Sequence, residues 1–395
     1  MIPAVLLAVA VGPAGSAFYQ PPLPLPGTQH GDVIWARPLT GSPVLPSAAS
    51  NELILYRTRT PDGRDVAVSG MLAVPKGTPP AGGWPVISWA HGTTGDGVLC
   101  TPSLDAPGEP EHSYLGPIDP VLDSFVKHGF AVVQTDYTGE GTPGVQPYLD
   151  GASEARDVID IVRAARQVEA SLSTRWVAAG HSQGGHSALF ATSLSQSYAP
   201  DLQNLGGVAM APVSDLPELI TYASTLATPT PAFAVVALFI AGEADLDPAV
   251  RPDAIFNLTG LAMLPQIRQL CFDSDLVGPR SFGGIAPARV FRSDADLAAL
   301  LRDAANDEPG SLAYAAPLLL LQGTADMLVR PALTDRLFAQ LCDGGATVRY
   351  VKYAGQTHDS LVPASAAAAL SWITSRFAGA AAPTTCGAAA PVMQH

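Results

Sequence analysis

The chain has 395 residues, of which 47% are hydrophobic and only 14% are charged. No window reaches the roughly 18 consecutive apolar residues of a membrane span, so we expect a soluble mature protein without a transmembrane segment. The formal net charge is −14 and there is no run of Lys or Arg, which argues against nucleic acid or an anionic membrane surface as a partner.

The N-terminal residues resemble an export signal. Met1 to Ala17 contain the apolar stretch AVLLAVAV, a Gly/Pro break and small residues before Phe18, which is typical of a secretory signal peptide, although a basic leading region is missing. The alternative is a disordered N-terminus. Four widely spaced cysteines without a CxxC pair favour two disulfides in an oxidising compartment over a metal site. They are Cys100, Cys271, Cys342 and Cys386, and the spacing alone permits three pairings. We therefore predict a secreted protein.

Short apolar segments alternate with helical patterns through most of the chain. We expect strands at 52–58, 66–74, 84–90, 130–136, 176–179, 205–212, 316–323 and 347–353, and helices at 120–128, 148–172, 183–196, 331–342 and 363–377. The strands at 84–90 and 130–136 are almost continuously apolar, as in sheets that are buried on both faces. This alternation predicts an α/β fold in which helices cover both faces of a mostly parallel central sheet.

The alternation stops between Val213 and Asp307, where Pro-rich turns and irregular segments dominate. We interpret residues 213–307 as a cap inserted into a single domain. The core of that domain would consist of residues 18–212 and 308–378. The Ala-rich tail at 379–395 is expected to be loose apart from Cys386.

One concentrated apolar stretch, Ala232 to Gly242, lies inside the predicted cap. It could line an acyl tunnel, face a lipid surface or form the interior of the cap itself. Glu243 and Asp245, which follow it, are expected to be solvated.

A serine lies at a predicted strand-to-helix corner. The segment Gly180-His181-Ser182-Gln183-Gly184 fits the G-x-S-x-G pattern of a nucleophile elbow. Small residues are needed two positions before and two positions after the serine, because the turn is too tight for side chains to pass the neighbouring strands. We predict that Ser182 is a nucleophile. The alternative is an accidental turn in which Ser182 only caps a helix.

A serine nucleophile needs a base that accepts its proton. Of the eight histidines, only His358 lies in a loop directly after a late strand, at the sheet edge where catalytic groups gather. His181 and His186 flank the serine, and we expect both to be structural. His358 is therefore the predicted base.

The acid that orients the histidine should lie between the serine and the histidine in the chain order that accompanies this elbow. Asp326 follows the buried strand at 316–323 and is our choice. Asp215 is the rival, but it more plausibly opens the cap as a helix N-cap.

Acyl chemistry also needs donors for the oxyanion. One donor should be the backbone N–H of Gln183, at the start of the helix after the serine. The other should come from the glycine-containing loop Ala90 to Gly97, and Thr93 is our choice, with assistance from its hydroxyl as a further option.

Three motifs occur together in this chain. They are Ser182, Asp326 and His358 in this order, HGTTG at 91–95 before Cys100-Thr101-Pro102-Ser103, and TDYTGEGTPG at 135–144. With them the chain resembles the secretory lipase family, which includes lipase A enzymes, over roughly Gly41 to Gly387. The resemblance implies a capped α/β-hydrolase fold that hydrolyses acylglycerols or other carboxylic esters without a cofactor. It also implies that Cys100 pairs with Cys271 and Cys342 with Cys386. Position 183 departs from the lipase pattern, with Gln in place of Gly.

The segment GEGTPG at 139–144 also fits the dinucleotide pattern, but Pro143 and Pro147 interrupt the region where the required helix would start. No metalloprotease or phosphate-binding motif is present, so we expect neither a cofactor nor a metal. Two alternatives to ester hydrolysis stay open. The acyl group could pass to an alcohol other than water, or the fold could be a binding module without catalysis.

Overall fold

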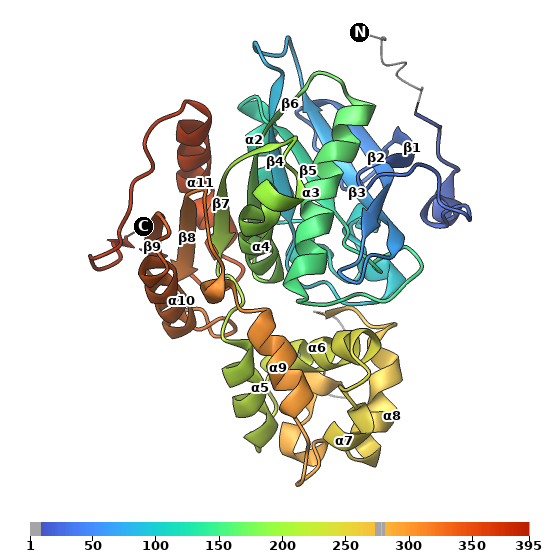
Figure 1. Cartoon of the computed structure of the whole chain (residues 1–395), viewed down its shortest axis with the longest axis vertical. Coiled ribbons are helices and arrows are strands. Elements are labelled where there is room, and N and C mark those ends of the chain that lie inside the picture. The colour runs from blue at the N-terminus through green and yellow to red at the C-terminus, as the bar shows by residue number, and fades with distance from the viewer. Residues whose placement is uncertain (1–8, 273–277, 279–280, 395) are drawn as a thin grey trace.

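The computed structural model describes residues 9–272, 278 and 281–394. Its centre is a ten-stranded sheet in the order β1-β2-β3-β5-β4-β6-β7-β8-β9-β10 (Figure 1). The strands are β1 (Val33–Pro38), β2 (Ala48–Arg59), β3 (Asp65–Pro75), β4 (Trp84–Ala90), β5 (Ala131–Thr135), β6 (Leu172–His181), β7 (Gln203–Met210), β8 (Leu318–Gly323), β9 (Val348–Tyr353) and β10 (Val392–Met393). The pairs β1/β2, β2/β3 and β3/β5 are antiparallel, and the pairs from β5 to β10 are parallel.

Helices cover both faces of this sheet (Figure 1). They are α1 (His112–Leu115), α2 (Asp119–Lys127), α3 (Gly151–Val168), α4 (Gln183–Tyr198), α10 (Pro331–Asp343) and α11 (Leu361–Phe377). In β4, Ile87 and Trp89 pack in the apolar cluster that contains α2 and α11, whereas Val86 and Ala90 pack in the cluster that contains α3 and α4. Because successive side chains point to opposite faces and both faces are covered, the strand is apolar at every position except Ser88, whose hydroxyl donates to the backbone oxygen of Val158 at 2.7 Å.

A helical unit follows β7 and lies beyond the carboxyl ends of the parallel strands (Figure 1). It contains α5 (Leu216–Thr225), α6 (Ala232–Leu246), α7 (Pro252–Ile255), α8 (Leu258–Ile267) and α9 (Ala298–Asn306). We call residues 213–307 the cap. Phe233 of α6 packs against the rings of Phe282 and Phe291, and Phe256 packs against the same two rings. These aromatic side chains form the interior of the cap.

The apolar stretch of α6 is part of this interior. The side chains from Phe233 to Gly242 are buried, so the stretch does not face a lipid surface. Glu243 is also buried, with 4% of its surface exposed, and the expectation that it is solvated is wrong. Asp245 is exposed as expected and forms an ion pair with Arg268.

Both ends of the chain add to the sheet in ways that the sequence did not predict. Strand β1 was missed, and Ala36 within it exchanges backbone hydrogen bonds with Ala10 and Gly12. The predicted signal peptide therefore falls partly outside the described residues, at 1–8, and partly on the sheet edge. The tail is not loose, because β10 pairs with β9. A pairing of two residues is too short to show a periodicity.

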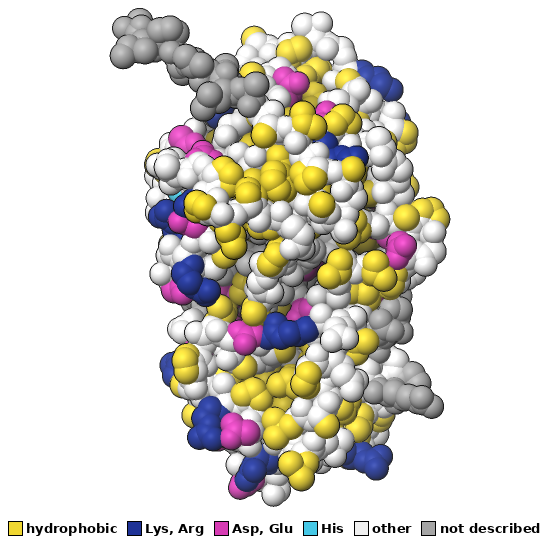
Figure 2. Space-filling view, turned by 90° about the vertical axis from the view of Figure 1, so that its right-hand side faces the viewer, with side chains coloured by type: hydrophobic (Ala, Val, Ile, Leu, Met, Phe, Trp, Pro, Cys, Tyr) yellow, Lys and Arg dark blue, Asp and Glu magenta, His cyan; other side chains and the backbone are white. Residues whose placement is uncertain are grey.

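None of the helices within the described parts of the chain has the length and apolar character needed to cross a membrane. On the face shown in Figure 2, acidic and basic side chains lie next to one another, and hydrophobic side chains are spread over both the core and the cap. The net charge is therefore not gathered into one acidic patch on this face.

Candidate active site

Ser182 lies at the corner between β6 and α4. Its backbone has φ 58° and ψ −119°, a conformation that costs energy for any residue with a side chain. Two backbone hydrogen bonds hold the corner in place. Ser182 N–H donates to the oxygen of Met210, at the end of β7, at 2.9 Å, and the N–H of Val213, the first residue of the cap, donates to Ser182 O at 3.3 Å. The sheet therefore maintains the strained turn.

The two glycines of the motif are required by the packing around this corner. A Cβ atom on Gly184 would overlap the carbonyl oxygens of Ala90 and His91, and one on Gly180 would overlap the carbonyls of Gly184 and Ala90. All of these are backbone atoms of β4, its following loop or the corner itself, and they cannot move aside. This is the physical reason why the sequence pattern was informative.

His358 and Asp326 form a hydrogen-bonded pair at the same edge of the sheet. Asp326 follows β8, His358 follows β9, and His358 Nδ1 lies 2.8 Å from Asp326 Oδ2. The Asp326 side chain is fully buried. Its Oδ1 accepts the backbone N–H groups of Leu328 and Val329, each at 2.9 Å, and its Oδ2 also accepts Gln322 Nε2 at 3.2 Å. Four donors thus fix the carboxylate that orients the imidazole.

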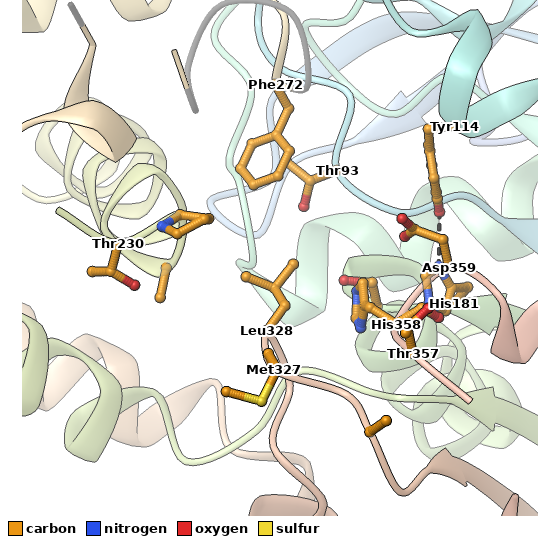
Figure 3. A pocket seen from close by; sticks show the side chains of 14 residues that line it. Thr93, Tyr114, His181, Thr230, Phe272, Met327, Leu328, Thr357, His358 and Asp359 are labelled. Carbon is orange, nitrogen blue, oxygen red and sulfur yellow. Dashed lines mark hydrogen bonds between the residues drawn. The ribbon is translucent and has the colours of Figure 1, made fainter. Parts of the chain in front are cut away.

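Ser182 and His358 line one cavity of about 390 Å³ between the core and the cap (Figure 3). Among the described residues, no hydrogen bond joins Ser182 Oγ to His358. Pairs of a nucleophile and a base are often looser without a substrate than with one. Phe272 from the cap and Leu328 from the loop after β8 point toward each other across the cavity (Figure 3).

Of the two predicted oxyanion donors, Thr93 lines this cavity, and Gln183 is the residue after Ser182. Within the part of the chain that the structure describes, neither the backbone N–H of Thr93 nor that of Gln183 has a hydrogen-bond partner. The Thr93 hydroxyl lies 2.6 Å from Tyr148 OH. The Gln183 side chain points away into the core, where Nε2 donates to Glu154 Oε1 at 2.8 Å. The Gln183 side chain therefore packs against α3, and it leaves the backbone N–H of Gln183 available.

A buried chain of hydrogen bonds links the loops that carry Thr93, Ser182 and His358, and the sequence analysis did not predict it. Gly92 N–H donates to Tyr114 OH at 2.9 Å, Tyr114 OH lies 2.9 Å from His181 Nδ1, and His181 Nε2 lies 3.1 Å from the backbone oxygen of His358. Burial lowers the pKa of His181 well below its usual value, so the ring is neutral and carries one N–H. That N–H must be on Nε2, because the carbonyl of His358 only accepts. Tyr114 then donates to Nδ1.

No local signal could have revealed the role of Tyr114, because it lies in the four-residue helix α1, far from the motif in sequence. The rival acid Asp215 precedes α5 as expected for an N-cap, but its side chain makes no capping hydrogen bond. It forms an ion pair with Arg336 instead.

The cap is fastened to the loop that carries Thr93. Cys100, which follows this loop by three residues, is bonded to Cys271 after α8, and Cys342 is bonded to Cys386. These are the pairings that the family resemblance implies. Phe272 N–H also donates to Thr94 O at 2.8 Å. Phe272, which lines the cavity, is therefore held beside the loop that carries Thr93.

The sequence profile of the secretory lipase family matches residues 119–385, which is more than half of the chain. The chain belongs to the secretory lipase family. Membership places it, at a general level, among ester hydrolases.

A relative from Mycobacterium tuberculosis (strain CDC 1551 / Oshkosh) is 28% identical over 384 residues, which cover 93% of this chain and 83% of the relative, and is named a probable inactive lipase. Lipase 10 of Candida albicans is 24% identical over 401 residues, which cover 95% of this chain and 83% of the relative.

Solved structures share the α/β-hydrolase fold of this secretory lipase family member. Candida antarctica lipase A superposes with a TM-score of 0.75 at 19% identity, over 93% of this chain and 86% of that one. The rice cell wall degrading esterase LipA from Xanthomonas oryzae superposes with a TM-score of 0.71 at 19% identity, over 88% and 97%. Because one relative is named as inactive, family membership alone does not establish catalysis, and the question depends on the residues of the site.

Proposed function

We propose that the chain is a secreted serine hydrolase of carboxylic esters, with Ser182 as nucleophile, His358 as base and Asp326 as the orienting acid. The observation that carries the proposal is the 2.8 Å pair between His358 and Asp326, which opens on the same cavity as a serine at a strained corner. A chain that had lost its catalytic role would have no need to keep a strained, glycine-dependent turn beside a buried aspartate and histidine.

In the proposed mechanism, Ser182 Oγ attacks the ester carbonyl while His358 Nε2 accepts its proton. The carbonyl oxygen becomes an oxyanion that accepts the free N–H groups of Thr93 and Gln183. His358 then donates its proton to the departing alkoxide, which leaves an acyl-enzyme on Ser182. A water molecule repeats the sequence, and the acid leaves with regeneration of Ser182.

The cavity walls favour an uncharged ester with a short or medium acyl chain. No described Lys or Arg lines the cavity, and its walls include Phe272, Leu328, Met327 and Pro231. Its volume of about 390 Å³ lies near the lower end of the usual range for ligand pockets, about 300–1,000 Å³. We therefore propose an esterase preference for short acyl chains over long-chain acylglycerols.

The proposal of secretion is supported by the two disulfides and by the apolar N-terminal stretch. N-terminal sequencing of the protein recovered from the medium of an expressing host tests it. A first residue near Phe18 is the expected result, and a protein retained inside the cell with Met1 intact contradicts it.

The test of the reaction compares the wild-type chain with Ser182→Ala on p-nitrophenyl butyrate and palmitate. We expect turnover of butyrate to exceed that of palmitate, and the variant to lose at least about 10³-fold in kcat with an unchanged melting curve. A fluorophosphonate should label the wild-type chain at Ser182 only. A folded wild-type protein that neither turns over esters nor reacts with the fluorophosphonate would overturn the proposed function.

A further inference from the structure

Three carboxylates meet where the cap joins the core. Asp150 is the N-cap residue of α3 in the core, Glu243 is on α6 of the cap, and Asp307 follows α9, where the chain leaves the cap. Each side chain offers one oxygen, and these three oxygens all lie within 4.8 Å of one another. In Figure 1, α6 lies directly beyond the end of α3 from which that helix starts. The cluster therefore bridges the two parts of the molecule.

Arg156, Arg302 and His186 lower the pKa of Asp150, Glu243 and Asp307, respectively, but each only weakly and from beyond ion-pair distance. Among the described residues, none of the three carboxylates takes part in an ion pair, and Arg302 pairs with Asp247 and Asp303 instead. Asp150 Oδ1 accepts only Ser153 N–H, at 2.7 Å, and Asp307 Oδ1 accepts only Gly151 N–H, at 2.9 Å.

Glu243 provides a second and separate observation. Its side chain is more than nine-tenths buried, and its Oε1 has no hydrogen-bond partner. The two aspartates are each satisfied by a helix or loop N–H, but the glutamate reaches toward them without any donor of its own. A buried carboxylate oxygen without a partner is strongly disfavoured. A proton, a water molecule or a cation would satisfy this oxygen.

Protons or a metal ion can supply the missing charge. Burial, together with repulsion by Asp150, raises the pKa of both Glu243 and Asp307 to about 8. A divalent cation would let all three carboxylates remain charged, with the coordination completed by water or backbone oxygen.

The chemistry of the donors selects among cations. The set contains only carboxylate oxygens, which suit hard ions such as Ca²⁺ and not the softer metals that prefer His or Cys. Ca²⁺ binds oxygen at about 2.3–2.6 Å, so that ligands on opposite sides of the ion are about 4.6–5.2 Å apart. Mg²⁺ keeps several water molecules, which a buried site with three protein ligands would have to exclude.

We propose that Asp150, Glu243 and Asp307 form a calcium site that fastens the cap to the core. The consequence for the cavity follows from α6, because its first residue Ala232 lines the cavity that contains Ser182, and Glu243 comes eleven residues later on the same rigid helix. An ion at Glu243 would hold the helix that forms part of the cavity wall. The inference does not depend on the proposed reaction, because it concerns the binding of an ion and the stability of the fold.

The test uses the full chain after treatment with EDTA and removal of the chelator. We expect CaCl₂ to raise the melting temperature in a saturable way and calorimetry to give one ion per chain, with a weaker response to MgCl₂. Glu243→Gln should abolish the calcium response while the far- and near-UV circular dichroism stays native. Asp245→Asn, two residues further on in an exposed position, is the matched control and should keep the full response.

Two results would overturn the proposal. One is a wild-type protein that shows no shift in melting temperature and no heat of binding up to about 10 mM CaCl₂, well above the weakest calcium affinities of extracellular modules. The other is an equal response of the wild type and Glu243→Gln, which would place the ion elsewhere on this acidic chain. If Glu243→Gln fails to fold, Asp307→Asn serves as the second variant, with the same expected loss of response.

Discussion

Replacement of Asp326 by Asn tests the orientation of the imidazole with almost no change in shape. The amide oxygen of the variant should take the place of Oδ1, because two backbone N–H groups, those of Leu328 and Val329, point at that position and cannot turn away. The NH₂ group then faces His358 Nδ1 and Gln322 Nε2. The glutamine can move, but the imidazole must give up its Nδ1 proton to accept from the amide.

His358 would then carry its proton on Nε2, the atom that must accept the proton of Ser182. In triads of this type the wrong tautomer lowers kcat about 10⁴-fold, which corresponds to about 5 kcal/mol in the activation barrier. The assay is kcat and kcat/KM for p-nitrophenyl butyrate, with melting temperature as the control for folding. Asp359→Asn, which removes an exposed carboxylate at the same cavity, is the matched variant and should stay close to wild type. An Asp326→Asn enzyme within tenfold of the wild type would refute the reasoning.

Three further predictions follow from buried contacts. Tyr114→Phe removes the link between Gly92 and His181. The variant should lose about 1–3 kcal/mol of unfolding free energy, and its kcat should change by a larger factor than its KM. An unchanged kcat would show that the link has no positioning role. Joint replacement of Cys100 and Cys271 by Ser removes a disulfide between residues that are 171 positions apart. This loss costs up to about 5 kcal/mol of stability in the chain-entropy model. The melting temperature should fall further than on removal of the Cys342–Cys386 disulfide, which spans 44 positions, and the reverse order would contradict this prediction. Burial raises the pKa of Asp157 to about 8, so the folded chain keeps a proton that the unfolded chain releases near pH 4. The stabilising contribution of the protonated Asp157 is therefore lost as the pH rises from about 4 toward 8, and the melting temperature should decline over this range. Asp157→Asn should make the decline shallower, and an unchanged slope would exclude Asp157 as its cause.

The elements that position the proposed catalytic groups could be predicted because their signals are local. Strand β4 is apolar at almost every position since helices cover both of its faces, and its predicted bounds, 84–90, agree with the structure. The corner at Ser182 was recognisable because the glycines around it are required by backbone atoms within a few residues or on the adjacent strand. Asp326 and His358 were chosen because each directly follows a strand, and parallel strands end at one edge.

Other features depend on contacts between segments that are distant in sequence. Tyr114 carries no motif, and only the packed fold brings its hydroxyl to His181. Strand β10 has two residues, so its place beside β9 rests on the neighbouring strand and on the disulfide at Cys386, and not on its own pattern. The spacing of the cysteines left three pairings open, and only the family resemblance implied the observed one.

The burial of Glu243 is a feature that local sequence could not predict. A glutamate after an apolar helical run is predicted to be solvated, because the charged form of a carboxylate is stable in water and unstable in a protein interior. The sequence by itself determined the alternating strands and helices from β2 to β9 outside the cap, the strained corner and the loops that carry Ser182, Asp326 and His358, since these follow from periodicity and from sterics between near neighbours. Only the tertiary structure decided that Glu243 is buried beside Asp150 and Asp307, because burial depends on which remote segments the cap brings into contact.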